Sequence, residues 1–302
     1  MRTKAFLFLT FLLFNTVSCN QNAKEKSNRL YIIATTNIVA DAVKQIVGER
    51  AEVISLMGAG VDPHLYKVSQ GDIQKLSEAD IIVSNGLHLE GRMNEVFDRL
   101  QNKTIIKLSD GAEPDKLLQI NQQNYDPHFW FDVMIWKSAI IYLSKQLMSI
   151  DTANAEFYQN NTKQYITKLD ILHHWINEQY SKVVPQKRIL ITAHDAFSYY
   201  GKAYQLEVLS LQGISTLSDF GLNDIDRLTH TITSRKVKSI FVETSISSKT
   251  IESIVENCNR KNHLVSIGGS LYSDALGTSD SETGTYIGML KYNTQTIAQA
   301  IK

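Results

Sequence analysis

The stretch ANAEFYQNNTKQYITKLDILHHWINEQYSKVV, residues 153–184, decides the architecture of this chain. Its inward-facing side chains recur at spacings of three and four residues, which predicts one continuous amphipathic helix that ends before Pro185. This stripe consists of Tyr158, Thr162, Tyr165, Leu169, Leu172, Ile176, Tyr180 and Val183. At about 1.5 Å per residue such a helix would span on the order of 45 Å. We therefore expect residues 151–185 to join two lobes as a stiff connector that limits hinge opening.

The segments on both sides of this helix alternate short β-rich runs with helical patterns. Before it, strands are predicted over 30–35, 51–56, 80–84 and 104–108, and helices over 37–47, 71–79 and 93–101. After it, strands are predicted over 189–192, 207–211, 239–242 and 264–267, and helices over 196–204, 223–235, 249–262 and 285–301. Such alternation favours parallel sheets built from βαβ units. We expect an α/β fold with an N-terminal lobe over 30–150 and a C-terminal lobe over 186–302, each a parallel four-stranded sheet flanked by helices.

The N-terminus has the pattern of an export signal. Arg2 and Lys4 precede an apolar run from Ala5 to Val17 that is too short to span a bilayer as a helix. This predicts a signal peptide over residues 1–18 and a protein exported to the periplasm or cell envelope. The following Cys19 stands in a segment that resembles the lipobox of bacterial lipoproteins, although Thr16 occupies the position where leucine is usual. We expect acylation of Cys19 to anchor the chain to a membrane, and the alternative is an ordinary signal peptide with an incidental cysteine.

Composition excludes several classes of function. Residues 19–29 are polar and predict a flexible tether. The rest of the chain is long enough to bury a large hydrophobic core. Lysine plus arginine equals aspartate plus glutamate at 31 each, so no net charge recruits nucleic acid. Only Cys19 and Cys258 are present, which excludes a zinc–thiolate site, and Cys258 is expected to be a buried apolar residue. No phosphate-binding loop motif is present, so the chain itself should not hydrolyse ATP.

The tripeptide Asp-Pro-His occurs twice, in Asp62-Pro63-His64-Leu65-Tyr66 and in Asp126-Pro127-His128-Phe129-Trp130. Asp-Pro is a common opener of turns, so one copy alone would mean little. Two turns that each present an imidazole instead suggest two segments supplying ligands to one metal ion, because histidine is the commonest metal ligand.

Two further candidate ligands follow predicted strands of the second half. His194 follows the strand at 189–192 and Asp274 follows the strand at 264–267, and ligands of open α/β sheets bind beyond the carboxyl ends of strands. Taken singly, His194 could be a core or capping residue and Asp274 a helix cap. Together with His64 and His128 they place two ligands in each lobe. Three imidazoles and one carboxylate suit a divalent ion such as Zn²⁺ or Mn²⁺.

The chain resembles the zinc- and manganese-binding solute-binding lipoproteins of bacterial ABC importers, the cluster 9 group of periplasmic binding proteins. The resemblance is carried by seven segments: Ala34-Thr35-Thr36-Asn37 with Asp41, Asp62 to Tyr66 with Asp72, Asn85-Gly86-Leu87-His88-Leu89-Glu90, Asp126 to Asp132, Thr192-Ala193-His194-Asp195-Ala196-Phe197, Glu243-Thr244-Ser245, and Tyr272-Ser273-Asp274-Ala275-Leu276-Gly277. It implies that the four ligand positions fall on His64, His128, His194 and Asp274. It also implies little lobe closure on binding, and a membrane permease with its ATPase as partners.

The resemblance leaves the choice of metal open. Members with glutamate as the third ligand resemble manganese proteins, whereas members with histidine there take zinc or both ions, so His194 favours zinc. Many zinc members insert a histidine-rich loop in the first lobe, but residues 111–126 contain no histidine.

Several nearby residues have a structural and a functional interpretation. Asp132, Asp195 and Glu243 could accept hydrogen bonds from the ligand imidazoles, or could be caps and solvated carboxylates. Tyr66 and Trp130 are expected to wall the cleft or to pack in the core. The other histidines, at positions 88, 173, 174, 230 and 263, are interpreted as packing or surface residues.

Two other functions remain to be weighed against metal capture. A zinc hydrolase would need an open coordination position and a base such as Glu243, but the chain has no His-Glu-x-x-His motif, so we expect no enzyme. A surface adhesion or partner-binding lipoprotein with a structural metal would unfold when that metal is removed.

Overall fold

The computed structural model describes residues 29–100, 102–218 and 220–302. The predicted signal peptide over 1–18, Cys19 and nearly all of the predicted tether lie outside the described residues. Within these ranges, no helix combines the length and the apolar character needed to cross a membrane.

The first lobe is a four-stranded parallel sheet with the strand order β2-β1-β3-β4. Its strands are β1 (Leu30–Ala34), β2 (Ala51–Ser55), β3 (Ile81–Ser84) and β4 (Thr104–Lys107). Its helices are α1 (Asn37–Val47), α2 (Gln70–Glu78), α3 (Asn94–Arg99) and α4 (Val133–Ile150). All residues of β3 are buried, as expected for a central strand that is covered on both faces. This lobe has the parallel four-stranded sheet that the sequence predicts.

The second lobe also contains four parallel strands, but its hydrogen-bond ladders form two pairs. These are β5 (Ile189–Thr192) with β6 (Glu207–Ser210), and β7 (Ser239–Glu243) with β8 (Ser266–Leu271). The helices are α6 (Ser198–Tyr204), α7 (Leu222–Ser234), α8 (Lys249–Arg260) and α9 (Tyr286–Ala300). The four-stranded sheet predicted here is therefore corrected to two pairs of parallel strands. Glu243, the last residue of β7, accepts hydrogen bonds through its carboxylate from the N–H groups of Ala193 and His194, which follow β5.

One predicted strand of this lobe is displaced along the chain. The apolar run at 264–267 predicts a strand from Leu264, whereas β8 begins at Ser266 and continues through two glycines to Leu271. Leu264 is 85% exposed, so its side chain contributes nothing to the sheet. The part of β8 from the glycines to Leu271 was not predicted, because glycine interrupts the pattern of side chains that indicates a strand.

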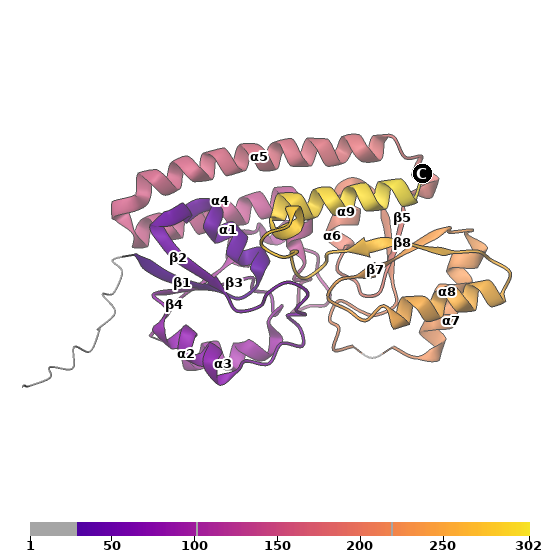
Figure 1. Cartoon of the computed structure of the whole chain (residues 1–302), viewed down its shortest axis with the longest axis horizontal. Coiled ribbons are helices and arrows are strands. Elements are labelled where there is room, and N and C mark those ends of the chain that lie inside the picture. Colours follow the sequence, from indigo (N-terminus) through magenta and orange to yellow (C-terminus); the bar gives the residue numbers. More distant parts are fainter. Residues whose placement is uncertain (1–28, 101, 219) are drawn as a thin grey trace, which may run out of the picture.

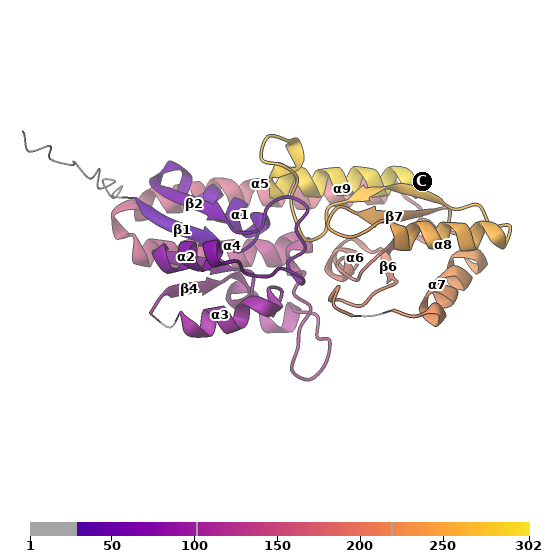
Figure 2. The same cartoon turned by 60° about the horizontal axis from the view of Figure 1, so that its bottom comes forward.

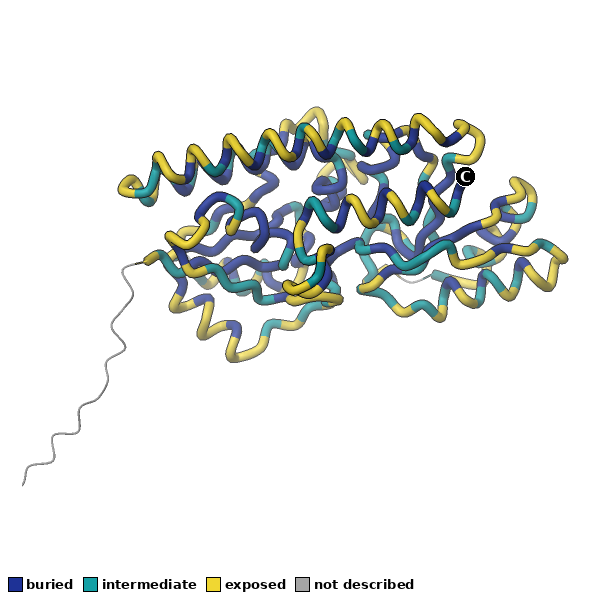
Figure 3. Tube along the Cα trace, turned by 45° about the horizontal axis from the view of Figure 1, so that its top comes forward, coloured by how far each residue is buried: buried dark blue, intermediate teal, exposed yellow. Residues whose placement is uncertain are grey.

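The long connecting helix is α5 (Ala155–Ser181), which runs along both lobes (Figure 1). Its stripe from Tyr158 to Tyr180 is buried as the spacing predicts, and Figure 3 shows buried and exposed residues alternating along its length. Helix α4 packs against α5 and is not among the helices expected from the sequence. The capping residue Asp132 followed by a periodic apolar run was the signal for this helix.

One cluster of buried apolar side chains contains residues of both lobes. Figure 2 shows the C-terminal helix α9 lying along α5. Trp136 of α4 stacks on Tyr286 of α9 with ring centroids 5.2 Å apart, and Phe131 packs on Phe197 at 4.4 Å. These pairs join the two halves of the chain beside α5. A shared close-packed core resists separation, so wide hinge opening would expose apolar surface at a cost of about 25 cal/mol per Å².

Candidate metal centre

The two Asp-Pro-His segments fold into the same local turn. In each copy an aspartate Oδ1 accepts a hydrogen bond from the backbone N–H of the histidine two residues later, at 2.8 Å from His64 and 2.9 Å from His128. Such a side-chain-capped turn holds its own backbone without neighbouring secondary structure. The repeated tripeptide therefore presents each imidazole from a fixed turn.

The other two sequence-predicted residues come from the second lobe. His194 follows β5, and Asp274 lies in the loop after β8. The side chain of Asn37, at the start of α1, makes two hydrogen bonds to the backbone of Leu276, at 2.9 and 3.1 Å. The indole Nε1–H of Trp130 donates to the carbonyl of Ser273 at 3.3 Å. Residues of the first lobe thus hold the Asp274 loop of the second.

Four side chains meet where the lobes join. His64, His128, His194 and Asp274 each offer a ligand atom, and these atoms all lie within 4.8 Å of one another. The Nε2 atoms of His64 and His128 are 3.3 Å apart, and the nearer Asp274 oxygens lie 3.4 to 3.7 Å from the three Nε2 atoms. An ion with tetrahedral ligands at about 2.1 Å would separate them by about 3.4 Å. The cluster therefore has the dimensions of one metal site.

These side chains are buried with polar atoms left unpaired. His64 is 3% exposed, Asp274 is 1% exposed, and the other two imidazoles are fully buried. Within the described residues, both carboxylate oxygens of Asp274 and Nε2 of His194 lack a hydrogen-bond partner. Buried polar atoms are nearly always paired, and leaving one unpaired costs roughly 1–3 kcal/mol. A cation bound between them would remove this cost.

Two carboxylates set the orientation of the imidazoles. Nδ1 of His128 donates to Oδ1 of Asp126 at 2.7 Å, and Nδ1 of His194 lies 2.6 Å from Oε2 of Glu243. Because a carboxylate only accepts, the Asp126 hydrogen bond places a proton on Nδ1 of His128, and the close Glu243 carboxylate favours the same position on His194. Both Nε2 atoms then face the cluster. Glu243 is among the carboxylates expected from the sequence to contact a ligand imidazole, whereas Asp126 is not, although Asp126 opens the second Asp-Pro-His copy.

The two other predicted carboxylates bond elsewhere. Asp132 caps α4 by accepting from the N–H groups of Met134 and Ile135. Asp195 accepts from the hydroxyl of Ser198 at 2.6 Å. Of the two interpretations that the sequence left open, these hydrogen bonds favour the local one for both residues. The reason is local, since each carboxylate reaches nearer donors in its own segment.

The three imidazoles differ in pKa, because nearby carboxylates outweigh burial at two of them but not at the third. Burial is the largest influence on His64 and lowers its pKa to about 3. Burial also acts against a proton on His128, but Asp126 and Asp274 outweigh it and raise its pKa to about 9. The same opposition, with Glu243 and Asp274 prevailing over burial, raises the pKa of His194 well above its usual value. The pKa of Asp274 falls despite burial because these two imidazoles face it.

These pKa shifts indicate how the charge of the cluster would change when a divalent ion binds. With no metal ion among them, the raised pKa values of His128 and His194 favour an extra proton on each, whereas the lowered pKa of His64 favours its neutral form. A divalent ion that displaces both protons brings the charge that they remove. The net charge of the buried cluster then stays the same, so metal binding requires no new buried charge.

A groove of about 590 Å³ beside His64 is lined by residues of both lobes. His88, Tyr125, Asp195 and Ile214 are among these residues. The predicted cleft wall Trp130 is buried, with its ring 5.1 Å from that of His128, whereas the hydroxyl of Tyr66 donates to Asp72 at 2.7 Å. Of the four candidate ligands, His64 is the one that lines this groove.

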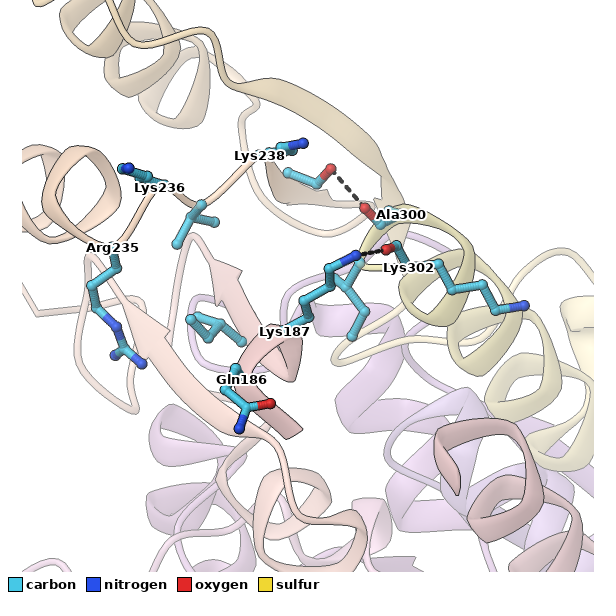
Figure 4. Close-up of a pocket in the computed structure, with 11 residues that line it drawn as sticks. Gln186, Lys187, Arg235, Lys236, Lys238, Ala300 and Lys302 are labelled. Atoms are coloured by element: carbon cyan, nitrogen blue, oxygen red, sulfur yellow. Dashed lines mark hydrogen bonds between the residues drawn. The ribbon is translucent and has the colours of Figure 1, made fainter. Parts of the chain in front are cut away.

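A second cavity, of about 220 Å³, lies between the first residues of β5 and β7 and the end of α9. It is lined by basic residues, among them Lys187, Arg235, Lys236 and Lys238. Figure 4 shows that the Lys236 and Lys238 side chains extend away from each other, and Arg235 pairs with Glu207. The basic side chains that line this cavity therefore do not converge on a common binding position.

The geometry agrees with the comparisons to known proteins. The family model described as the zinc-uptake complex component A, periplasmic (ZnuA), matches residues 32–300. The chain belongs to the ZnuA family. The chain is similar to a manganese-binding lipoprotein, MntA of Bacillus subtilis, at 40% identity over 99% of this chain and 98% of the relative. The zinc-binding protein TroA of Treponema pallidum is 36% identical over 89% of this chain and 88% of its own length.

Solved structures of similar proteins show the same architecture. The periplasmic zinc-binding protein TroA of Treponema pallidum superposes with a TM-score of 0.89 at 36% identity, covering 90% of this chain and 99% of TroA. A manganese-bound periplasmic protein of Candidatus Liberibacter asiaticus superposes with a TM-score of 0.79 at 25% identity, covering 91% and 100%. These relatives are named as binding proteins and lipoproteins rather than as enzymes.

Proposed function

We propose that this protein binds one divalent transition metal ion, Zn²⁺ or Mn²⁺, outside the cytoplasm and delivers it to the permease of an ABC importer. The observation that carries the proposal is the convergence of three Nε2 atoms and one buried carboxylate at metal-ligand spacing. Membership of the ZnuA family supports it, as does the naming of the pneumococcal relative PsaA as a manganese ABC transporter substrate-binding lipoprotein, 30% identical over 99% of this chain.

In this proposal His64, His128, His194 and Asp274 are the ligands. Asp126 and Glu243 hold two of the imidazoles in the tautomer that binds through Nε2. Two ligands come from each lobe, so the metal joins the lobes directly. The ATPase that powers import is a separate protein, and an acylated Cys19 would keep the binding protein beside the permease.

Ligand number favours binding over hydrolysis. Zinc hydrolases keep one coordination position open for water, whereas four protein ligands fill a tetrahedral zinc ion. Glu243, the one base proposed from the sequence, lies against Nδ1 of His194.

The choice between the two metals follows coordination number. One oxygen ligand and three nitrogen ligands suit tetrahedral zinc. Both oxygens of Asp274 face the imidazoles, at 3.5 Å from His128 and 3.4 Å from His194, which permits a fifth ligand and makes manganese acceptable.

The test is metal titration of residues 20–302 after removal of bound metal. The parent protein should bind one equivalent of Zn²⁺ or Mn²⁺, and His128→Ala should lose this binding. His88→Ala is the matched control, because His88 is an exposed histidine of the neighbouring groove that lies outside the cluster. Absence of stoichiometric binding by the parent, or parental binding by His128→Ala, would reject the site.

A further inference from the structure

A side-chain hydrogen bond joins the His64 turn to the second lobe. The hydroxyl of Thr216 donates to Oδ2 of Asp62 at 2.7 Å. The other oxygen of the same carboxylate, Oδ1, accepts the backbone N–H of His64 at 2.8 Å. One aspartate therefore connects the backbone that carries a candidate ligand of the first lobe to a loop of the second.

The loop that carries Thr216 is attached to the other ligand-bearing strand. The backbone N–H of Gln212 donates to the carbonyl of Ala193 at 2.8 Å, and the N–H of Asp195 donates to the carbonyl of Gly213 at 3.3 Å. Both contacts flank His194. The side-chain amide of Gln212 also stabilises the loop, because its Nε2–H donates to the carbonyl of Ser218 at 3.1 Å.

This chain of contacts runs from His64 to His194 without passing through the metal position. The turn before His64 lies close to the second lobe as well, since a Cβ on Gly60 would stand 3.6 Å from the carbonyl oxygen of Thr244. Asp62 and Thr216 are both partly buried, which limits competition from water for their hydrogen bond.

We propose that Thr216 is a positioning residue for metal retention, which holds the His64 turn against the segment that carries His194. The inference rests on the proposed function. A metal ion with ligands from both lobes can leave only when at least one ligand withdraws. The Thr216 hydroxyl opposes withdrawal of His64, so its loss should accelerate dissociation while leaving every ligand in place.

The test measures the rate at which a chelator captures the metal from the loaded protein. Thr216→Val keeps the shape and β-branching of threonine but removes the donor, and we expect dissociation to become about tenfold faster, as for loss of a hydrogen bond to a charged group. Thr216→Ser should restore the parental rate. Ser215→Ala is the matched control, because the Ser215 hydroxyl oxygen accepts only from the N–H of Leu217 within its own loop.

A second measurement separates positioning from general stability. The melting temperature of metal-free Thr216→Val should match that of the Ser215→Ala control. Equal dissociation rates for Thr216→Val and the parent, or equally fast dissociation for Thr216→Ser and Thr216→Val, would overturn the proposal while leaving metal binding intact. A parent protein that binds no metal would instead overturn the proposed function, and the role of Thr216 with it.

Discussion

Oδ1 of Asp126 accepts two hydrogen bonds from His128, one from its backbone N–H at 2.9 Å and one from its ring Nδ1 at 2.7 Å. The equivalent oxygen of Asp62 accepts only the backbone N–H of His64, and the second oxygen of Asp62 turns to Thr216. Two copies of one tripeptide thus share a turn but use their carboxylates differently. In the second copy the carboxylate orients the imidazole, and in the first it joins the lobes.

Replacing Asp126 with asparagine should weaken metal binding about 10- to 100-fold, the usual effect of losing a carboxylate behind a ligand imidazole. The turn should persist, because asparagine can still accept the backbone N–H. Asp195→Asn is the matched control, since Asp195 is a neighbouring carboxylate that bonds Ser198 instead. Isothermal titration with the metal measures both variants, and equal affinities would show that Asp126 does not orient His128.

Metal affinity should keep rising with pH well above the usual imidazole range. His128 has a pKa raised to about 9, so its proton still competes with metal at neutral pH, and His194 competes in the same direction. We expect binding near pH 7 to release about two protons. Calorimetric titration in buffers of different ionisation enthalpy measures this number.

The same pKa shift affects the metal-free protein in the opposite sense. A histidine whose pKa is raised by folding stabilises the folded state at low pH, and that contribution disappears as pH rises through about 9 for His128.

A metal affinity that becomes independent of pH above about 7 would contradict the raised pKa values of His128 and His194, since unshifted imidazoles titrate near 6.5.

Metal should stabilise the protein without being needed for folding. The apolar clusters of both lobes are built from side chains outside the candidate ligand set, so the chelated protein should keep its near-UV circular dichroism. Free metal at a hundred times its Kd should add about 2.7 kcal/mol to the free energy of unfolding. Asp274→Asn should lose most of this gain in urea denaturation. Unfolding on chelation would instead favour a structural metal and the adhesion alternative.

The connecting helix should depend on its buried stripe. Leu169 of α5 is fully buried, and Leu169→Ala should lower the free energy of unfolding by about 3 kcal/mol through lost apolar contact and a residual cavity. Ile171 on the same helix is 64% exposed, and Ile171→Ala should change stability by less than about 0.5 kcal/mol. Urea denaturation of the metal-free proteins compares the two, and similar losses would show that the stripe is not the packed face.

The sequence by itself determined the elements whose signals are local. A hydrophobic period of 3.6 predicted α5, alternation of strand and helix predicted parallel sheets, and the repeated tripeptide singled out the two turns that carry His64 and His128. Helix α4 was equally readable from its cap and apolar period, and was overlooked. These features are encoded within a few neighbouring residues, so no knowledge of the fold is needed to find them.

Only the tertiary structure decided which carboxylate serves which group. Asp126, Asp132 and Asp195 all lie within a few residues of a candidate ligand, yet only Asp126 reaches an imidazole. The division of the second sheet into two ladders and the contact between Asp62 and Thr216 were equally invisible in the sequence. A hydrogen bond forms only within a few tenths of an ångström and a narrow range of angles. For residues distant in the chain, those distances are set by how the lobes pack and not by spacing along the sequence.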